Sequence, residues 1–168
     1  MNNLLQEFYV IINKFELKDI ICIDETSFNA FLIRKYGYSK KGTRCIIQTN
    51  NQNVFKKYIG IFAITISGIL SYIIYSKGGM DSNRLIEFLN KFLLEQKNKL
   101  IILDNTSCHQ IEVVKDLIQL NNNLLYTIPY NHRTQAIEGF FNVLKSKLAK
   151  KKGFTYEELC KNTFKITK

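Results

Sequence analysis

The chain has 168 residues, a formal net charge of +10 and a hydrophobic content of 46%. This composition excludes a disordered tail and fits one folded domain with a sizeable core. Its apolar runs fall far short of the ~20 residues that a membrane-spanning helix needs. The N-terminus, MNNLLQEF, has no basic region before an apolar one, so no targeting signal is expected. The cysteines at 22, 45, 108 and 160 stand too far apart to predict a zinc site or a disulfide framework, which favours an intracellular protein.

The basic charge has two explanations. An excess of lysine favours a polyanionic partner, most simply nucleic acid. Ile, Asn and Lys together make up 60 of the 168 residues, however, and such usage also follows from an AT-rich genome. Position is more informative than the total: eight lysines against two glutamates lie between residues 145 and 168, which makes the end of the chain basic.

The first third of the chain predicts a helix, a strand and a basic loop. Apolar side chains recur at helical spacing from residue 4 to residue 15, which predicts an amphipathic packing helix. Residues 19–23 predict a short strand that ends in the acidic motif DET at 24–26. The segment 34–44 carries five basic charges and two glycines, so it is expected to be an exposed loop or hairpin. It is either a solvated turn or a loop that contacts phosphates, with Lys40, Lys41 and Arg44 as candidates.

The middle of the chain predicts an antiparallel group of strands followed by a helix. Three successive strands are expected between Cys45 and Tyr75, with a hairpin turn at Ser67 and Gly68. Asp81 or Ser82 should then cap a helix whose apolar positions are Leu85, Phe88, Leu89, Phe92 and Leu93. A helical connection of this length suits a parallel crossover, which would set the strand at 100–103 beside the strand at 19–23.

Asp104 directly follows four consecutive apolar residues, LIIL at 100–103. Such a run predicts a strand that is buried on both faces, and ligands collect at the carboxyl ends of central strands. A carboxylate there needs compensation for its lost hydration, which a metal ion would supply. The alternative is that Asp104, with Asn105 and Thr106, only caps the turn into a helix at 111–120. If the strands are parallel, Asp24 and Asp104 should end side by side.

The last third predicts a strand at 124–128, the single proline Pro129 and a helix. Glu138 lies at the flank of the apolar stripe of this helix, and Asn142 and Lys145 follow it along the same edge. Taken alone, Glu138 is an ordinary surface glutamate.

Four motifs occur in a fixed order: DET at 24–26, GYSKKG at 37–42, DNTSCH at 104–109, and PYNHRTQAIEGFFNVLK at 129–145. Together they resemble the catalytic domain of mariner-like transposases and their bacterial insertion-sequence relatives, the DDE superfamily endonucleases. The resemblance covers residues 19–152, and the interval of 34 positions from Asp104 to Glu138 suits the family. Tyr38 replaces the usual tryptophan of the second motif. His132 and Ala136 replace two usual prolines of the last motif, and Gln135 replaces the usual asparagine, which removes constraints on the loop before Glu138.

The resemblance implies an α/β, ribonuclease H-like fold, also found in retroviral integrases, with a mixed five-stranded sheet flanked by helices. It implies metal-dependent DNA strand cleavage and strand transfer during DNA transposition. The chemistry must activate a water or a 3′-hydroxyl, neutralise charge at phosphorus and stabilise the leaving oxygen, which two Mg²⁺ or Mn²⁺ ions about 4 Å apart can do. Hard oxygen ligands favour these ions over zinc. In this scheme Asp24 bridges both ions, Asp104 holds one and Glu138 holds the other.

Other residues receive supporting roles from the same scheme. The side chain of Glu25 should point to the opposite face of its strand from that of Asp24, so Glu25 should support the site without binding metal. His109 is expected to orient the site or touch DNA. The DNA backbone should meet basic and polar side chains, namely Lys40, Lys41, Arg44, Asn142 and Lys145. If the three acids lie together without metal, their repulsion should raise at least one pKa, and Asp104→Asn should stabilise the metal-free fold.

The expected organisation is an N-terminal helix at 1–18, the catalytic domain at 19–152 and a basic helix or tail at 153–168. About 18 residues are too few for a helix-turn-helix module ahead of the catalytic domain. The expected partners are therefore transposon-end and target DNA, a second copy of the chain, and a separate helix-turn-helix protein. The expected location is wherever that DNA lies: a prokaryotic cytoplasm, a nucleus or a viral factory. The alternatives are one half of a split transposase and a degenerate, non-catalytic remnant that still binds nucleic acid.

Overall fold

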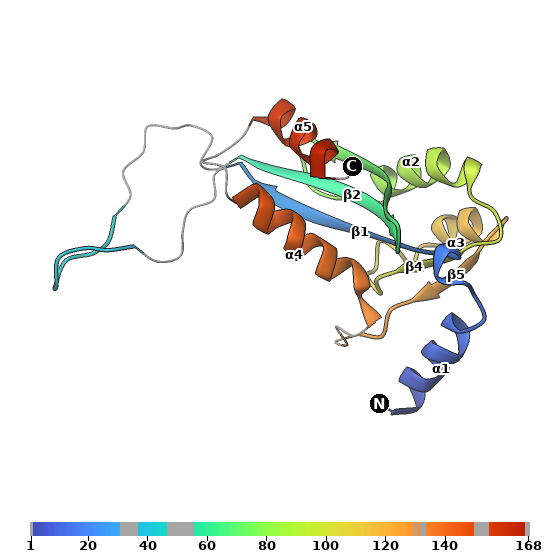
Figure 1. The fold of residues 1–168 in the computed structure, drawn as a ribbon. Coiled ribbons are helices and arrows are strands. Elements are labelled where there is room, and N and C mark those ends of the chain that lie inside the picture. The colour runs from blue at the N-terminus through green and yellow to red at the C-terminus, as the bar shows by residue number, and fades with distance from the viewer. Residues whose placement is uncertain are drawn as a thin grey trace.

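The computed structural model describes residues 2–30, 37–46, 56–129, 131, 134–149 and 155–166. Within these residues one sheet of five strands has the order β3-β2-β1-β4-β5, and helices cover both of its faces (Figure 1). The predicted mixed five-stranded sheet flanked by helices is thus confirmed. The strands are β1 (Ile20–Asn29), β2 (Lys57–Thr65), β3 (Gly68–Tyr75), β4 (Leu100–Leu103) and β5 (Asn123–Tyr126). The helices are α1 (Asn2–Ile12), α2 (Ser82–Phe92), α3 (Glu112–Gln119), α4 (Ala136–Ala149) and α5 (Tyr156–Ile166), with short 3-10 helices at Leu17–Asp19 and Leu93–Glu95.

Strand β1 is longer than its apolar residues predict. The expected end near Ile23 is wrong, because β1 continues through the polar DETS sequence to Asn29. Strand β2 explains the extension, since it pairs with β1 in the antiparallel sense as far as Asn29, opposite Lys57. These backbone hydrogen bonds keep the polar residues extended whatever their own preference. Asp24 therefore lies within a strand, not at the end of one.

The antiparallel part of the sheet is β1, β2 and β3. The predicted hairpin is confirmed: Ile66 and Ser67 form the turn, and Gly68, the first residue of β3, has a φ of +122°, a conformation that favours glycine. The first of the three strands predicted between Cys45 and Tyr75 is not found at Cys45 and Ile46, which are exposed and irregular. Its remaining part, 47–55, lies outside the described residues. The strand that completes the antiparallel group with β2 and β3 is β1 instead.

The parallel part of the sheet is β1, β4 and β5. Strand β4 pairs in parallel with both β1 and β5, as the crossover through α2 predicts. All four residues of β4 are buried, because it lies in the interior of the sheet under helices on both faces. Helix α2 begins as expected, since the side chain of Asp81 accepts a hydrogen bond from the amide of Arg84 (2.9 Å).

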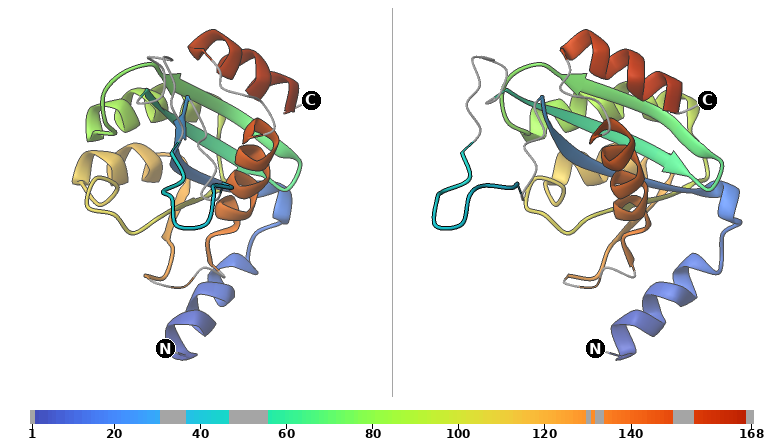
Figure 2. Two further views of the ribbon diagram at one scale, coloured as in Figure 1. Left: turned by 90° about the vertical axis from the view of Figure 1, so that its left-hand side faces the viewer. Right: turned by 60° about the vertical axis from the view of Figure 1, so that its left-hand side comes forward.

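Helices lie on both faces of the sheet (Figure 2), and two apolar layers pack them against it. Helices α2 and α3 cover one face, where Ile21, Ile23, Ile101 and Leu103 meet Leu85, Leu89, Val114 and Ile118. Helices α4 and α5 cover the other face over β1, β2 and β3, around Phe28, Phe62, Phe141, Leu144 and Leu159. Because side chains alternate along a strand, Cys22 belongs to the α4 face while its neighbours Ile21 and Ile23 belong to the α2 face.

Helix α1 lies at the edge of the molecule below β4 and β5 (Figure 1). Phe8 is its buried anchor, and it packs against Leu100 and Ile102 on the same face of the sheet as α4. The helix ends at Ile12, three residues earlier than the apolar spacing predicts. No helix in the described ranges combines the length and the apolar content needed to cross a membrane.

Candidate active site

The register of the parallel strands brings two acids to the same level of the sheet. Ile20, Ile21 and Cys22 of β1 face Leu100, Ile101 and Ile102 of β4. Continued by two residues, this register sets Asp24 opposite Asp104, which comes directly after β4. The prediction that the two acids lie side by side is therefore confirmed, although β1 runs on beyond its acid.

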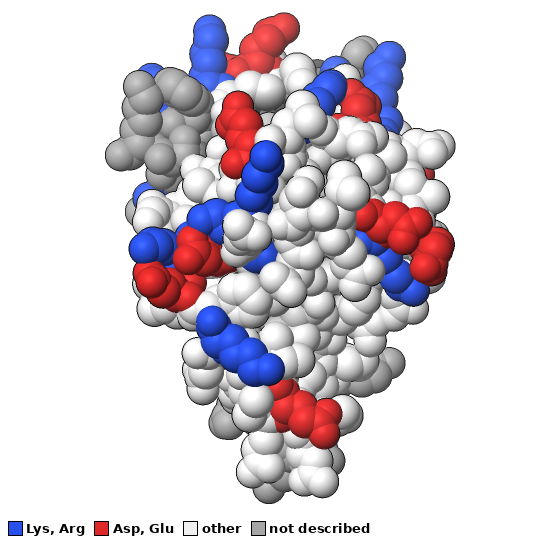
Figure 3. Space-filling model, turned by 90° about the vertical axis from the view of Figure 1, so that its right-hand side faces the viewer, with Lys and Arg blue, Asp and Glu red and all other residues white. Residues whose placement is uncertain are grey.

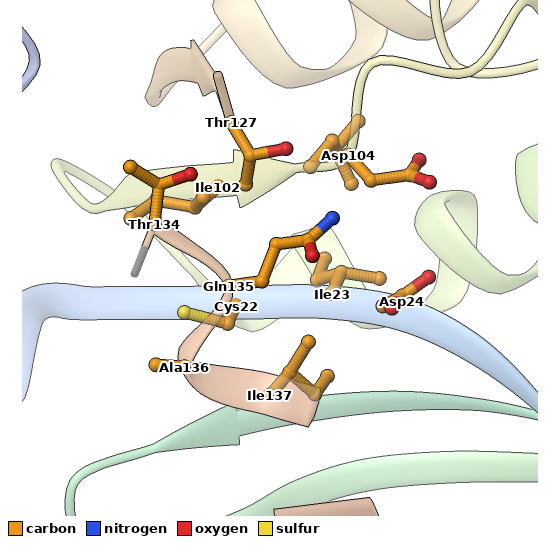
Figure 4. Close-up of a pocket in the computed structure, with 11 residues that line it drawn as sticks. Cys22, Ile23, Asp24, Ile102, Asp104, Thr127, Thr134, Gln135, Ala136 and Ile137 are labelled. Atoms are coloured by element: carbon orange, nitrogen blue, oxygen red, sulfur yellow. The ribbon is translucent and has the colours of Figure 1, made fainter. Parts of the chain in front are cut away.

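Both acids line one small pocket, with a free volume of about 10 Å³, between β1, β4 and the start of α4 (Figure 4). In the close-up the two carboxylates lie at the same end of the pocket, and the side chain of Gln135 extends toward them from below. The remaining wall comes from β1, β4, the end of β5 and the first turn of α4: Cys22, Ile23, Ile102, Leu103, Thr127, Thr134, Ala136 and Ile137. The pocket is thus mostly apolar, with its acids at one end.

Asp24 is a carboxyl group with a strongly displaced pKa. Burial raises its pKa to about 7, although a hydrogen bond from the amide of Glu25 (2.7 Å) acts in the opposite direction. The charges of Asp104 and Glu25 raise the pKa further, and the charge of His109 lowers it in part. In the metal-free protein Asp24 is therefore only partly ionised at neutral pH.

His109 lies between two carboxylates. Its side chain is completely buried; Nε2 lies 2.8 Å from Oε1 of Glu25, and Nδ1 bonds to Oδ1 of Asp104. Burial alone would lower the pKa of His109, but hydrogen bonds and charge from Asp104 and Glu25 outweigh it and raise the pKa to about 11. The imidazole is therefore protonated at neutral pH and donates from both nitrogens. The hydroxyl of Tyr126 donates to the carbonyl of His109 (2.8 Å), which fixes its backbone as well.

The pKa of Asp104 is shifted in the opposite direction from that of Asp24. Burial raises its pKa, but the hydrogen bond and charge of His109 outweigh that effect, so the net pKa lies below the usual range. Thr106 also donates from its hydroxyl to Oδ1 of Asp104 (3.0 Å). The pKa shift of Asp104 is thus opposite to the one that the expected stabilisation by Asp104→Asn requires. Asp104 does accept hydrogen bonds from Thr106 in the turn, but it is not the cap of α3, which begins at Glu112 with Ile111 as its N-cap.

Among the described residues, the donor atoms of one group of three potential metal ligands all lie within 4.8 Å of one another: Glu25, Cys108 and His109. A protonated imidazole has no free lone pair, so His109 does not offer a ligand while it bridges the two carboxylates. The carboxylate oxygens of the three predicted acids, Asp24, Asp104 and Glu138, do not all lie within 4.8 Å of one another.

Glu138 lies in the first turn of α4 and is half-buried. Its neighbour in the sequence, Ile137, lines the pocket together with Asp24 and Asp104. A carboxylate in a first helical turn also interacts favourably with the amino end of the helix. The structure thus brings Asp24 and Asp104 together in the pocket, and Glu138 is not among the residues that line it.

The remaining candidates lie outside the pocket. Lys40, Lys41 and Arg44 are exposed on the segment 37–46, which extends away from the sheet (Figure 1). Asn142 and Lys145 are exposed on α4. The view in Figure 3, from the opposite side to the extended segment, shows basic and acidic side chains interspersed rather than a basic patch.

The polar pocket residues Thr127 and Thr134 were missed by sequence reasoning. Both are buried, with exposed fractions of 6% and 4%. Cys22 could have been found, because it lies two residues before Asp24 and therefore on the same face of β1. Thr127 and Thr134 follow β5 in an irregular segment, for which residue spacing has no predictive value.

The sequence model of a family described as DDE superfamily endonuclease matches residues 19–160. A comparison with curated protein sequences finds no match. Solved structures do match. The Mos1 transposase paired-end complex with the left transposon end is 19% identical with a TM-score of 0.75, and the match covers 99% of this chain and 52% of that one. The mariner Mos1 paired-end complex with Mg is 19% identical with a TM-score of 0.76, and the match covers 99% of this chain and 52% of that one.

The crystal structure of the catalytic domain of Mos1 mariner transposase is 18% identical with a TM-score of 0.71, covering 99% of this chain and 78% of that one. The chain thus spans about half the length of the Mos1 chains in the DNA complexes. At these identities the likeness establishes the fold, and the sheet is that of the ribonuclease H-like proteins.

Proposed function

The chain belongs to the DDE superfamily endonucleases, and on that basis we propose that it is the catalytic domain of a DNA transposase, acting with divalent metal ions. The substrate is a DNA phosphodiester bond, and the reactions are strand cleavage by water and strand transfer by a 3′-hydroxyl. The observation that carries the proposal is the pair Asp24 and Asp104 in one pocket, with the pKa of Asp24 raised to about 7.

The pocket suits a divalent cation. Two carboxylates share it, and burial disfavours the charge on Asp24, so a cation would relieve the cost of ionising that group. Carboxylate oxygens are the ligands that Mg²⁺ and Mn²⁺ prefer. Two of the Mos1 paired-end complexes are described as containing Mn and Mg. We assign Asp24, Asp104 and Glu138 as the residues that hold two such ions.

Each residue has a defined task in this scheme. The bound ions supply Lewis acidity and lower the pKa of the attacking hydroxyl group. Asp24 provides a carboxylate from the rigid centre of the sheet. Asp104 is kept ionised by the protonated His109, so it can accept a cation without first losing a proton. Glu25 fixes the other nitrogen of His109 and thereby the orientation of the ring that holds Asp104.

Exposed basic residues would hold the DNA backbone near the pocket. Lys145 lies on the same helix as Glu138, while Lys40, Lys41 and Arg44 lie on the extended segment. The Mos1 chains are described in complex with transposon-end DNA. We propose the corresponding DNA as substrate here, a second copy of the chain and a separate helix-turn-helix protein as partners, and the compartment that contains the DNA as location.

The test is nicking of supercoiled plasmid by the purified chain in Mg²⁺, in Mn²⁺ and in EDTA. We expect metal-dependent nicking that disappears in Asp24→Asn, Asp104→Asn and Glu138→Gln. Glu112→Gln is the matched control, because Glu112 is an acid in the first turn of α3 that pairs only with Lys115 among the described residues (3.4 Å). Circular dichroism must show that each variant is folded. Undiminished nicking by Glu138→Gln would refute the third ligand, and an inactive wild-type chain that still binds DNA would favour the non-catalytic remnant.

A further inference from the structure

The segment between β5 and α4 is bonded at its start to the strand that precedes Asp104, and it leads at its end into the helix that carries Glu138. At its start, the amide of Thr127 donates to the carbonyl of Leu103 (2.9 Å), the residue directly before Asp104. At its end, α4 begins at Ala136 and carries Glu138 in its first turn. The position of Glu138 relative to Asp104 therefore depends on how firmly this segment is held.

The chain's single proline, Pro129, lies in this segment and fixes one backbone angle near its start. One side chain in addition joins residues from the two ends of the segment. The hydroxyl of Thr134 donates to the carbonyl of Asn131 (2.8 Å) and accepts from the amide of Ile128 (3.2 Å). The amide of Thr134 also donates to the carbonyl of Asn131 (3.0 Å).

Burial makes these hydrogen bonds significant. Thr134 is 4% exposed, so water cannot readily replace its partners if the hydroxyl is removed. Thr134 also lines the pocket together with Gln135, Ala136 and Ile137, which lead into α4 (Figure 4). A continuous series of contacts thus runs from Leu103 through Thr127 and Ile128 to Thr134, and from there to the helix that carries Glu138.

We propose that Thr134 is a positioning residue, whose hydroxyl holds the start of α4 so that Glu138 reaches the cation bound by Asp24 and Asp104. The inference rests on the proposed function, since it assigns Glu138 as a metal ligand. Thr134 itself touches neither metal nor substrate. Its role is to hold the end of the segment by two hydrogen bonds, to the amide of Ile128 and the carbonyl of Asn131.

The test compares Thr134→Val, which keeps the shape and removes the hydroxyl, with Thr134→Ser, which keeps the hydroxyl. Mn²⁺ binding is measured by titration calorimetry on the whole chain, and plasmid nicking is measured in parallel. Residues that orient metal ligands typically change metal affinity by about 10- to 100-fold, so we expect Thr134→Val to weaken Mn²⁺ binding by at least about tenfold. Thr134→Ser should bind as the wild type does. Thr134→Ala repeats the test should Thr134→Val fail to fold.

A second background separates positioning from general stability. If Thr134 acts through Glu138, Thr134→Val should weaken Mn²⁺ binding in the wild-type chain and have no further effect in Glu138→Gln. An equal loss in both backgrounds, or no loss in the wild-type background, would overturn the inference. Failure of the proposed function is distinguishable, because the wild-type chain would then neither bind Mn²⁺ nor nick DNA.

Discussion

Nε2 of the buried His109 lies 2.8 Å from Oε1 of Glu25, a residue 84 positions earlier in the chain. The other ring nitrogen bonds to Asp104, so two carboxylates beside the pocket share one imidazolium. Asp104 thus has a cationic partner in direct contact, whereas no ion pair of that kind is seen for Asp24 among the described residues. The site is thus electrostatically asymmetric before any metal binds.

The first prediction concerns this histidine. His109→Ala should lower the free energy of unfolding by about 3 kcal/mol, because it leaves two largely buried carboxylates without their shared cation. Urea unfolding followed by circular dichroism measures the change. Ser107→Ala is the control, because Ser107 is an exposed residue of the same loop and should change stability by less than about 0.5 kcal/mol. Equal stability of the two variants would show that the bridge contributes nothing.

The second prediction distinguishes the two aspartates in EDTA at pH 8. Asp24→Asn should be more stable than the wild type, by at most about 4 kcal/mol, because ionising a carboxyl group with a raised pKa opposes folding. Asp104→Asn should be less stable than the wild type, because His109 then loses a charged partner. Melting curves of the three proteins measure both effects.

The pH dependence of Asp24→Asn follows from the same pKa. A folded pKa of about 7 exceeds the unfolded value of about 3.9, so Asp24 lowers stability progressively as pH rises between these values. The advantage of Asp24→Asn should therefore be full above pH 7 and shrink as pH falls toward 4. Saturating Mg²⁺ should reverse the order, since the ion stabilises the folded wild type by mass action. An advantage that is independent of both pH and Mg²⁺ would argue against a metal site.

The third prediction is that the chain binds duplex DNA weakly and without sequence preference. Lysine and arginine contacts to phosphates depend on salt, with about one logarithmic unit of slope per contact. Lys40→Gln combined with Lys41→Gln should reduce the salt slope by about two units in a fluorescence-anisotropy titration. The charge-matched control is Lys91→Gln combined with Lys115→Gln, on α2 and α3. Selective, salt-insensitive binding to one sequence would contradict the prediction.

The fourth prediction concerns thiol reactivity. Burial, and to a smaller extent the charge of Asp24, raises the pKa of Cys22 to about 11, whereas Cys45 is exposed. Because the thiolate is the reactive form, iodoacetamide at pH 8 should modify Cys45 well before Cys22. Mass spectrometry of peptides after timed quenching measures the order. Rapid modification of Cys22 would mean that the pocket opens more readily than its apolar lining suggests.

Much of the fold follows from local patterns in the sequence. The apolar run at 100–103, the hairpin glycine Gly68 and the helix cap Asp81 each lie where the structure has the corresponding element. These features are local: a strand buried on both faces must be apolar throughout, and a turn or a cap needs particular residues. The order of the acids along the chain, with the motifs around them, was also sufficient to suggest the family.

Contacts between distant segments decided the rest. Strand β1 continues through DETS because β2 supplies its hydrogen bonds, which no residue of β1 reveals. His109 bridges Glu25 and Asp104 because the parallel register brings positions 80 apart to one level of the sheet. The opposite pKa shifts have different main causes, since burial raises the pKa of Asp24 whereas the hydrogen bond and charge of His109 outweigh burial and lower that of Asp104. Both causes depend on burial and distance in space and not on separation along the chain.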